Sequence, residues 1–86
     1  MSNEREGRLH AAHALYQAGC YFHAEISARS LTLPQPGDLR ARAVLAASLY
    51  RRGLVELALD QIEVAIEHWP GDEDLALLRQ VFAEAR

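Results

Sequence analysis

The four histidines and the single cysteine are the side chains of this 86-residue chain most suited to binding a metal. His10 and His13 lie three residues apart, which could bring both imidazoles to one edge of a helix, and His23 follows. A zinc site takes three or four ligands at recognisable spacing, and the chain has neither a Cys pair nor an HExxH motif. We therefore expect no metal and no cofactor, with the histidines on the surface or in a groove.

Cys20, beside Tyr21 and His23, raises the possibility of an activated thiol. A nucleophile also needs a third group that orients its base and a site that stabilises the oxyanion. We find no such constellation, no glycine loop that could hold a phosphate and no paired-carboxylate signature. Cys20 is better explained as a small thiol packed at a turn. The sequence predicts no enzyme and no catalytic residue.

Composition narrows the class of protein further. The length suits one small domain with limited burial, and a lone cysteine allows no internal disulfide, which indicates a reducing compartment. The formal charge of −3 argues against nucleic acid, which needs a concentrated basic face. No apolar run approaches the length of a membrane span, and residues 1–7 lack the apolar stretch of a signal peptide. We expect a soluble cytoplasmic protein.

The strongest pattern is an internal repeat with a period of 34 residues. A shift of 34 superposes Tyr16 on Tyr50, Gly19 on Gly53, and the sequence Pro-Gly-Asp at 36–38 on the same three residues at 70–72. Arg8, Ala12, Leu15 and Ala24 match Arg42, Ala46, Leu49 and Ala58 at the same shift. A tyrosine, a glycine and a Pro-Gly-Asp run that coincide at one shift are unlikely to match by chance.

The pattern within each repeat predicts two helices. In the first, apolar residues recur at helical spacing up to Gly19, and the following helix ends by Leu33, because Pro34 disfavours helix before it. The first helix starts either at a capping box on Asn3 or, since Gly7 weakens its first turn, at Arg8. Asp38 and Asp72 are expected N-caps of later helices. We predict an all-α single domain of five helices, each antiparallel to its neighbours: a first repeat at about 5–38, a second at about 39–72 and a capping helix at about 73–86.

These features resemble the tetratricopeptide repeat family, and the resemblance covers nearly the whole chain. The matching positions are the small residues at helix crossings, the aromatics before each turn, the turn glycines and the closing prolines: Ala12, Ala46, Ala24, Ala58, Tyr16, Tyr50, Gly19, Gly53, Pro36 and Pro70. The chain departs from the family at Arg8 and Arg42, where a bulky aromatic is expected, and at Pro34, which shortens a helix. The departures suggest a divergent member with a less well packed first repeat.

The resemblance implies a short α-solenoid whose concave side is lined by the first helix of each hairpin. The residues placed there are Leu9, His13, Tyr16, Gln17, Ala43, Ala47, Tyr50, Arg51, Leu77 and Val81. A groove of this composition suits the amphipathic helix of another protein. Two alternatives stay open: the same residues pack against each other, or the module forms a homo-oligomer through Leu54, Leu57 and Trp69 and has no separate client.

Within the family, the chain resembles the needle-subunit co-chaperones of bacterial type III secretion systems. The resemblance lies in Ala14-Leu15, in the run from Gly19 to Glu25 (GCYFHAE), in Val44 to Leu49, and in Arg51, Gly53 and Ala58-Leu59. It implies a bacterial, cytoplasmic chaperone that holds a hydrophobic helix of the needle subunit, with a second small helical co-chaperone alongside.

Overall fold

The computed structural model describes residues 2–33 and 37–86, without the side chains of residues 2 and 3. The fold is all-α, and no strand occurs in the described ranges. Its five helices are α1 (Ser2–Gln17), α2 (Tyr21–Arg29), α3 (Leu39–Arg51), α4 (Val55–His68) and α5 (Glu73–Glu84). The predicted fold class is therefore confirmed.

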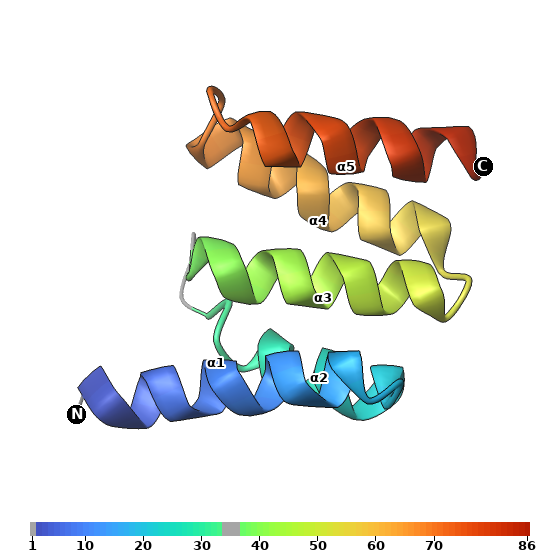
Figure 1. The fold of residues 1–86 in the computed structure, drawn as a ribbon. Coiled ribbons are helices and arrows are strands. Elements are labelled where there is room, and N and C mark those ends of the chain that lie inside the picture. The colour runs from blue at the N-terminus through green and yellow to red at the C-terminus, as the bar shows by residue number, and fades with distance from the viewer. Residues whose placement is uncertain (1, 34–36) are drawn as a thin grey trace.

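The helices stack as two hairpins followed by a single helix (Figure 1). Each helix packs against the next one along the chain, and α1 also contacts α3. Because the chain reverses at every turn, α1, α3 and α5 run in one direction and α2 and α4 run back (Figure 1). The first helix of each hairpin and the closing helix thus lie side by side.

The turns inside the two hairpins have the same geometry. Gly19 and Gly53 have φ of 84° and 81°, in the left-handed region that favours glycine. The amide of Cys20 donates to the carbonyl of Leu15 at 2.9 Å, and the amide of Leu54 donates to Leu49 at the same distance. These bonds satisfy carbonyls that the helix end would otherwise leave unpaired. Both predicted glycine turns are confirmed.

The helix starts agree with the prediction at two places and differ at one. The side chain of Asp38 accepts from the amides of Arg40 and Ala41, and that of Asp72 accepts from Leu75, so both aspartates are N-caps. Helix α1 begins at Ser2, and Asn3 lies within it, so the expected cap at Asn3 is wrong. A long-range contact offsets the weak helix propensity of Gly7, because Arg5 donates to the carbonyl of Leu31 in the turn after α2.

The larger hydrophobic cluster belongs to the second hairpin and α5. It includes Leu45, Leu49, Ile62, Leu75 and Phe82, all at most 2% exposed. The first hairpin contributes Ala12 and Ala28 to this cluster. A second, small cluster of Leu9, Leu31 and Ala41 joins the first hairpin to α3. The small residues predicted at the helix crossings, namely Ala12, Ala46, Ala24 and Ala58, are fully buried.

The two departures from the repeat pattern behave differently from each other. Arg8 is exposed and lies 3.9 Å from the carboxylate of Glu4. Arg42 is buried, and its guanidinium donates to Oε1 of Gln61 at 2.6 Å and to the carbonyl of Thr32 at 3.2 Å. Burial lowers the pKa of Arg42 from its usual value. Arg42 therefore connects the end of the first hairpin to α4.

The connections that close the two hairpins also differ, although both contain Pro-Gly-Asp. Gly37 has φ of 74°, whereas Gly71 lies outside the positive-φ region. Helix α2 already ends at Arg29, and a turn follows through Ser30 and Leu31. Pro34 and Pro36, to which the sequence assigned the end of this hairpin, lie outside the described residues.

A trough along α3 as the candidate functional site

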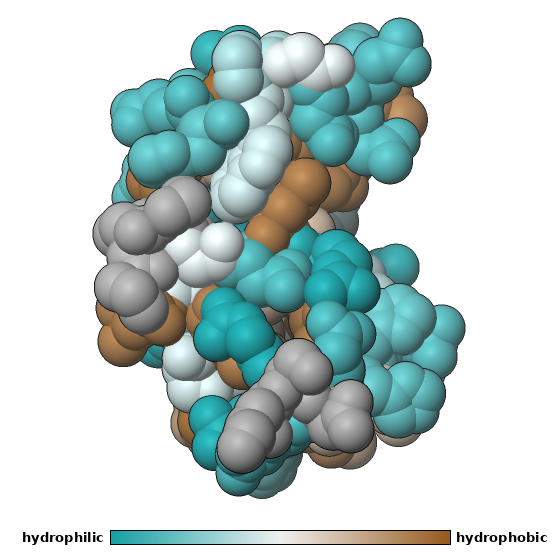
Figure 2. Space-filling model, turned by 90° about the vertical axis from the view of Figure 1, so that its left-hand side faces the viewer, coloured by the Kyte–Doolittle hydropathy of each residue, from teal (hydrophilic) through white to brown (hydrophobic). Residues whose placement is uncertain are grey.

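The concave side of the molecule is formed by α1, α3 and α5. These helices lie in front of α2 and α4 in Figure 1, and the quarter turn to Figure 2 brings that side to the right. Figure 2 looks along the helices and shows a hollow on the right, between the upper and lower parts of the molecule. Since the hollow appears in a view along the helix axes, it is a trough that runs parallel to α3.

One half of the trough is a cavity of about 470 Å³ between α1 and α3. It is lined by Glu6, Leu9, His10, His13, Arg40, Ala43 and Val44. Three residues predicted for the groove (Leu9, His13 and Ala43) are thus brought together. Leu9 is only 8% exposed and packs with Leu31 and Ala41, so most of its side chain is buried behind the cavity wall and little of it is open to a partner.

The prediction missed four residues of this lining: Glu6, His10, Arg40 and Val44. The repeat itself could have identified them, because the 34-residue shift pairs Glu6 with Arg40 and His10 with Val44. The first pair forms an ion pair with 2.8 Å between the guanidinium and the carboxylate. This contact crosses one end of the trough and joins α1 to α3.

At the opposite end, Arg51 is placed between aromatic rings. Its Nε donates to the hydroxyl of Tyr16 at 3.2 Å, and its guanidinium carbon lies 5.9 Å from the ring centre of Tyr21. The rings of Tyr16 and Tyr21 are 5.3 Å apart. The hydrogen bond to Tyr16 raises the pKa of Arg51 above its usual value. Since an arginine is charged throughout the physiological pH range, this end of the trough carries a positive charge. Gln17, which the sequence also placed here, is exposed on α1.

Tyr50 lies on α3 but contributes to the core as well as to the surface. Its ring is half-buried and stacks on that of Phe82, with 4.7 Å between the ring centres and an interplanar angle of 21°. Tyr50 therefore holds α5 against α3. Its aromatic body is unavailable to a partner on that face.

The far wall of the trough is α5. The 34-residue shift pairs Ala43 with Leu77 and Ala47 with Val81, so larger apolar side chains stand on α5 where alanines stand on α3. Leu77 is 61% exposed and Val81 is 41% exposed, whereas Ala43 and Ala47 are half-buried. Small residues on the central helix and larger ones on the flanking helix produce a low floor with a raised apolar wall.

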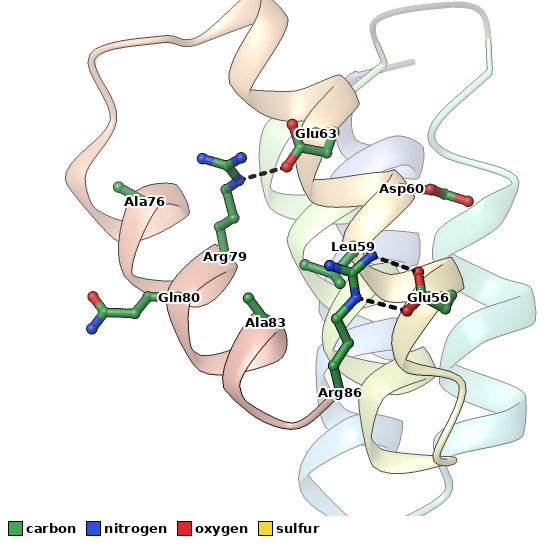
Figure 3. A pocket seen from close by; sticks show the side chains of 9 residues that line it. All are labelled: Glu56, Leu59, Asp60, Glu63, Ala76, Arg79, Gln80, Ala83 and Arg86. Carbon is green, nitrogen blue, oxygen red and sulfur yellow. Dashed lines mark hydrogen bonds and ion pairs between the residues drawn. The ribbon is translucent and has the colours of Figure 1, made fainter.

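A second hollow, of about 490 Å³, lies between α4 and α5 (Figure 3). Arg79 of α5 and Arg86, which follows the end of α5, reach across it to Glu63 and Glu56 of α4. Asp60 lies between these two pairs and makes no ion pair with any described residue. The acidic face of α4 is thus used to hold α5. In the described part of the chain no group of three or more His, Cys, Asp or Glu side chains could hold a metal ion.

The surface considered for self-association is only partly open. Leu57 is 50% exposed, but Leu54 and Trp69 are half-buried against the main core. Two further exposed apolar residues, Phe22 and Ile26, lie one turn apart on α2 at 51% and 52% exposure. The guanidinium carbon of Arg52 lies 4.9 Å from the ring centre of Phe22 and covers part of it.

Comparison with known proteins gives no match to a family model, to a curated protein or to a solved structure. Among the described residues, no helix is long and apolar enough to cross a membrane.

Proposed function

We propose that this chain is a non-enzymatic protein-binding module of the tetratricopeptide type whose trough holds an amphipathic helix of another protein. The observation that carries the proposal is the low floor at Ala43 and Ala47 beside the exposed wall at Leu77 and Val81. Packed helices approach to about 8–10 Å, which requires small residues on at least one of them. The floor of this trough meets that requirement.

The dimensions of the trough also suit a helix. From Arg40 to Arg51 the α3 helix rises about 16 Å, which matches about three turns of a partner. Leu77 and Val81 are spaced one turn apart and would contact an apolar stripe on such a partner. On the opposite wall, His10 and His13 present rings with both apolar faces and polar edges. A partner helix with one apolar face and polar flanks could contact both the apolar wall on α5 and the histidine wall on α1.

The test is a display selection with a library of 16-residue amphipathic peptides against the purified chain. We expect recovered peptides to form helices and to bind with a measurable Kd by fluorescence anisotropy. Ala47→Arg fills the floor of the trough and should weaken binding about tenfold or more, by steric exclusion of the close helix approach.

Ala76→Arg is the matched control, since Ala76 is an exposed alanine of α5 that lines the other hollow. It adds the same side chain and should leave the Kd unchanged. Recovery of no helical peptide, or equal binding to the Ala47→Arg variant, would contradict the proposal.

A narrower form of this function is a co-chaperone for the needle subunit of a bacterial type III secretion system, acting in the cytoplasm. It is supported by the resemblance of residues 19–25 and 44–49 and by the apolar wall of the trough. Co-expression with needle subunits, with and without a second small helical co-chaperone, should yield a soluble complex that Ala47→Arg disrupts. Failure with every needle subunit would reject this narrower form and leave the general one standing.

Self-association without a client is the alternative, favoured by the exposure of Phe22, Ile26 and Leu57. Sedimentation equilibrium at micromolar concentration distinguishes the two. A dimer that Leu57→Glu or Ile26→Glu dissociates, together with a trough that selects no peptide, would replace our proposal by this one.

A further inference from the structure

We propose that the trough binds its partner helix in one direction, antiparallel to α3. The acidic residues in the first turn of the bound helix lie against Arg51, and the basic residues in its last turn lie against the start of α5. This inference rests on the proposed function and specifies the chemistry of the partner. It depends on the placement of charges at the two ends of the trough.

Arg51 is the positive group at one end. Six other arginines pair with a carboxylate of the chain, namely Arg8, Arg29, Arg40, Arg52, Arg79 and Arg86. Arg51 has no such carboxylate among the described residues, and its guanidinium lies against Tyr16 and Tyr21. Glu84, at the position of α5 equivalent to Tyr50, forms no ion pair with it. An acidic side chain of a partner would supply the missing charge.

The tyrosines also fix the guanidinium in place. The hydrogen bond from Nε to Tyr16 leaves the two terminal nitrogens of Arg51 to donate elsewhere. A guanidinium that is already oriented loses less side-chain entropy when it pairs with a carboxylate. Arg51 is therefore a better receptor for an acidic residue than a freely moving surface arginine.

The other end of the trough, at the start of α5, has the opposite charge, since the 34-residue shift pairs Asp74 with Arg40 of the cavity lining. Glu73 and Asp74 lie in the first turn of α5, both exposed and neither paired with a described residue. Nearby on the same rim, Arg40 pairs with both Glu6 and Asp38, so this group carries a net negative charge. A basic residue of the partner would find its complement at Glu73 and Asp74.

Helix dipoles favour the same direction. Helices α1 and α3 both end near Arg51, and their C-termini carry partial negative charge. A partner whose N-terminus lies at that end opposes its dipole to theirs. Acidic residues in the first turn and basic residues in the last turn stabilise a helix by themselves. In the antiparallel direction these same residues face the opposite charges at the two ends of the trough.

The probes are two lactam-bridged 16-residue peptides with the same apolar stripe and the same composition. One has two Glu in the first turn and two Lys in the last, and the other has these charges exchanged. Circular dichroism checks that both are equally helical, because the exchanged peptide opposes its own dipole. Their Kd values are measured by fluorescence anisotropy on the wild-type chain, on Arg51→Glu and on Arg8→Glu.

We expect the peptide with N-terminal Glu to bind the wild type about tenfold tighter than the exchanged peptide. Arg51→Glu should abolish or reverse this preference. Arg8→Glu makes the same charge change outside the trough and should preserve the preference. High salt should reduce the preference, since exposed charges are screened.

Equal affinity for the two peptides, or a preference that survives Arg51→Glu, would overturn the inference while the proposed function stands. If neither peptide binds, and the display selection also recovers none, the proposed function fails and this inference fails with it.

Discussion

The α1–α2 and α3–α4 hairpins have the same turns and the same buried alanines, but they differ in what surrounds them. The second hairpin lies between the first hairpin and α5, and its core includes Leu45, Leu49 and Ile62. The first hairpin has a neighbour on one side, and α2 is nine residues long, against 14 for α4. We therefore expect one repeat pattern to give two hairpins of unequal stability, because stacked helices are stabilised by their neighbours.

The outer faces of the second helices also differ. Positions 22 and 26 on α2 are Phe and Ile, whereas the equivalent positions on α4 are Glu56 and Asp60. On α4 the acidic face pairs with Arg79 of α5 and with Arg86, which follows that helix. On α2 a single buried carboxylate, Glu25, receives Arg29 from its own helix and Arg52 from the second hairpin. The polar contacts of Glu25 and Arg42 thus add to the apolar packing that joins the first hairpin to the second.

Substitution of the repeat arginines should produce the largest difference between the hairpins. Arg42→Ala leaves the Gln61 side chain and the Thr32 carbonyl without a buried donor, and should lower the free energy of unfolding by about 3 kcal/mol. Arg8→Ala removes an exposed ion pair and should leave the unfolding midpoint unchanged. Urea denaturation followed by circular dichroism measures both. Equal effects would mean that the two arginines have equivalent surroundings.

The two Pro-Gly-Asp segments give the next contrast. A Cβ at Gly37 would lie 2.6 Å from Cα of Thr32, and its φ is 74°. Gly37→Ala should therefore cost about 2 kcal/mol or more. A Cβ at Gly71 meets nothing within 4 Å, so Gly71→Ala should be neutral or slightly stabilising. Thermal melts of both variants test this, and a Gly37→Ala variant as stable as wild type would show that the connection after α2 relaxes freely.

The attachment through Glu25 should respond to acid. Burial raises the pKa of this carboxyl, but hydrogen bonds from Arg29 and Arg52 outweigh burial and hold it below the usual value of 4.5. Because the pKa is lower in the folded chain, the stabilisation is complete above the unfolded pKa and is lost as the pH falls through the folded one. Between pH 7 and pH 3, the free energy of unfolding should fall less in Glu25→Gln than in the wild type. Urea titration at each pH measures this difference.

The effect of Glu25→Gln on stability at neutral pH should be smaller than those of Arg42→Ala and Gly37→Ala, about 1 kcal/mol. It should appear first as faster hydrogen exchange in α1 and α2, with α3 and α4 protected as before. Uniform loss of protection across all five helices would contradict the division into two unequal hairpins.

Much of the fold could be predicted from the sequence because it is set by local signals. Gly19 and Gly53 end the first helix of each hairpin at positive φ, which favours glycine. Asp38 and Asp72 cap the N-termini of α3 and α5. The start of α1 was not predictable in this way, since it depends on Arg5 reaching the carbonyl of Leu31, 26 residues away. Likewise, two Pro-Gly-Asp segments of identical sequence differ because Gly37 packs against Thr32.

The sequence predicts which residues lie at the candidate site better than it predicts how their side chains contact one another. The repeat predicts one shared face for Leu9, His13 and Ala43, because equivalent positions on stacked helices share a face, and these three residues line one cavity. It does not indicate that Tyr50 stacks on Phe82 or that Arg51 binds Tyr16, since both depend on side chains from other helices. The burial of Arg42 was missed for the same reason: Gln61 and Thr32 come from separate elements.

The most direct test of the account asks which of two surfaces a selected helical peptide covers. Amide shifts of the labelled chain, followed by NMR during titration with the peptide, distinguish the trough from the exposed face of α2. We predict the largest changes along one stripe of α3 at Arg40, Ala43, Ala47 and Arg51, with further changes at His10, His13, Leu77 and Val81 of the flanking helices. Changes confined to Phe22, Ile26 and their neighbours on α2 would contradict the assignment of the trough as the binding surface.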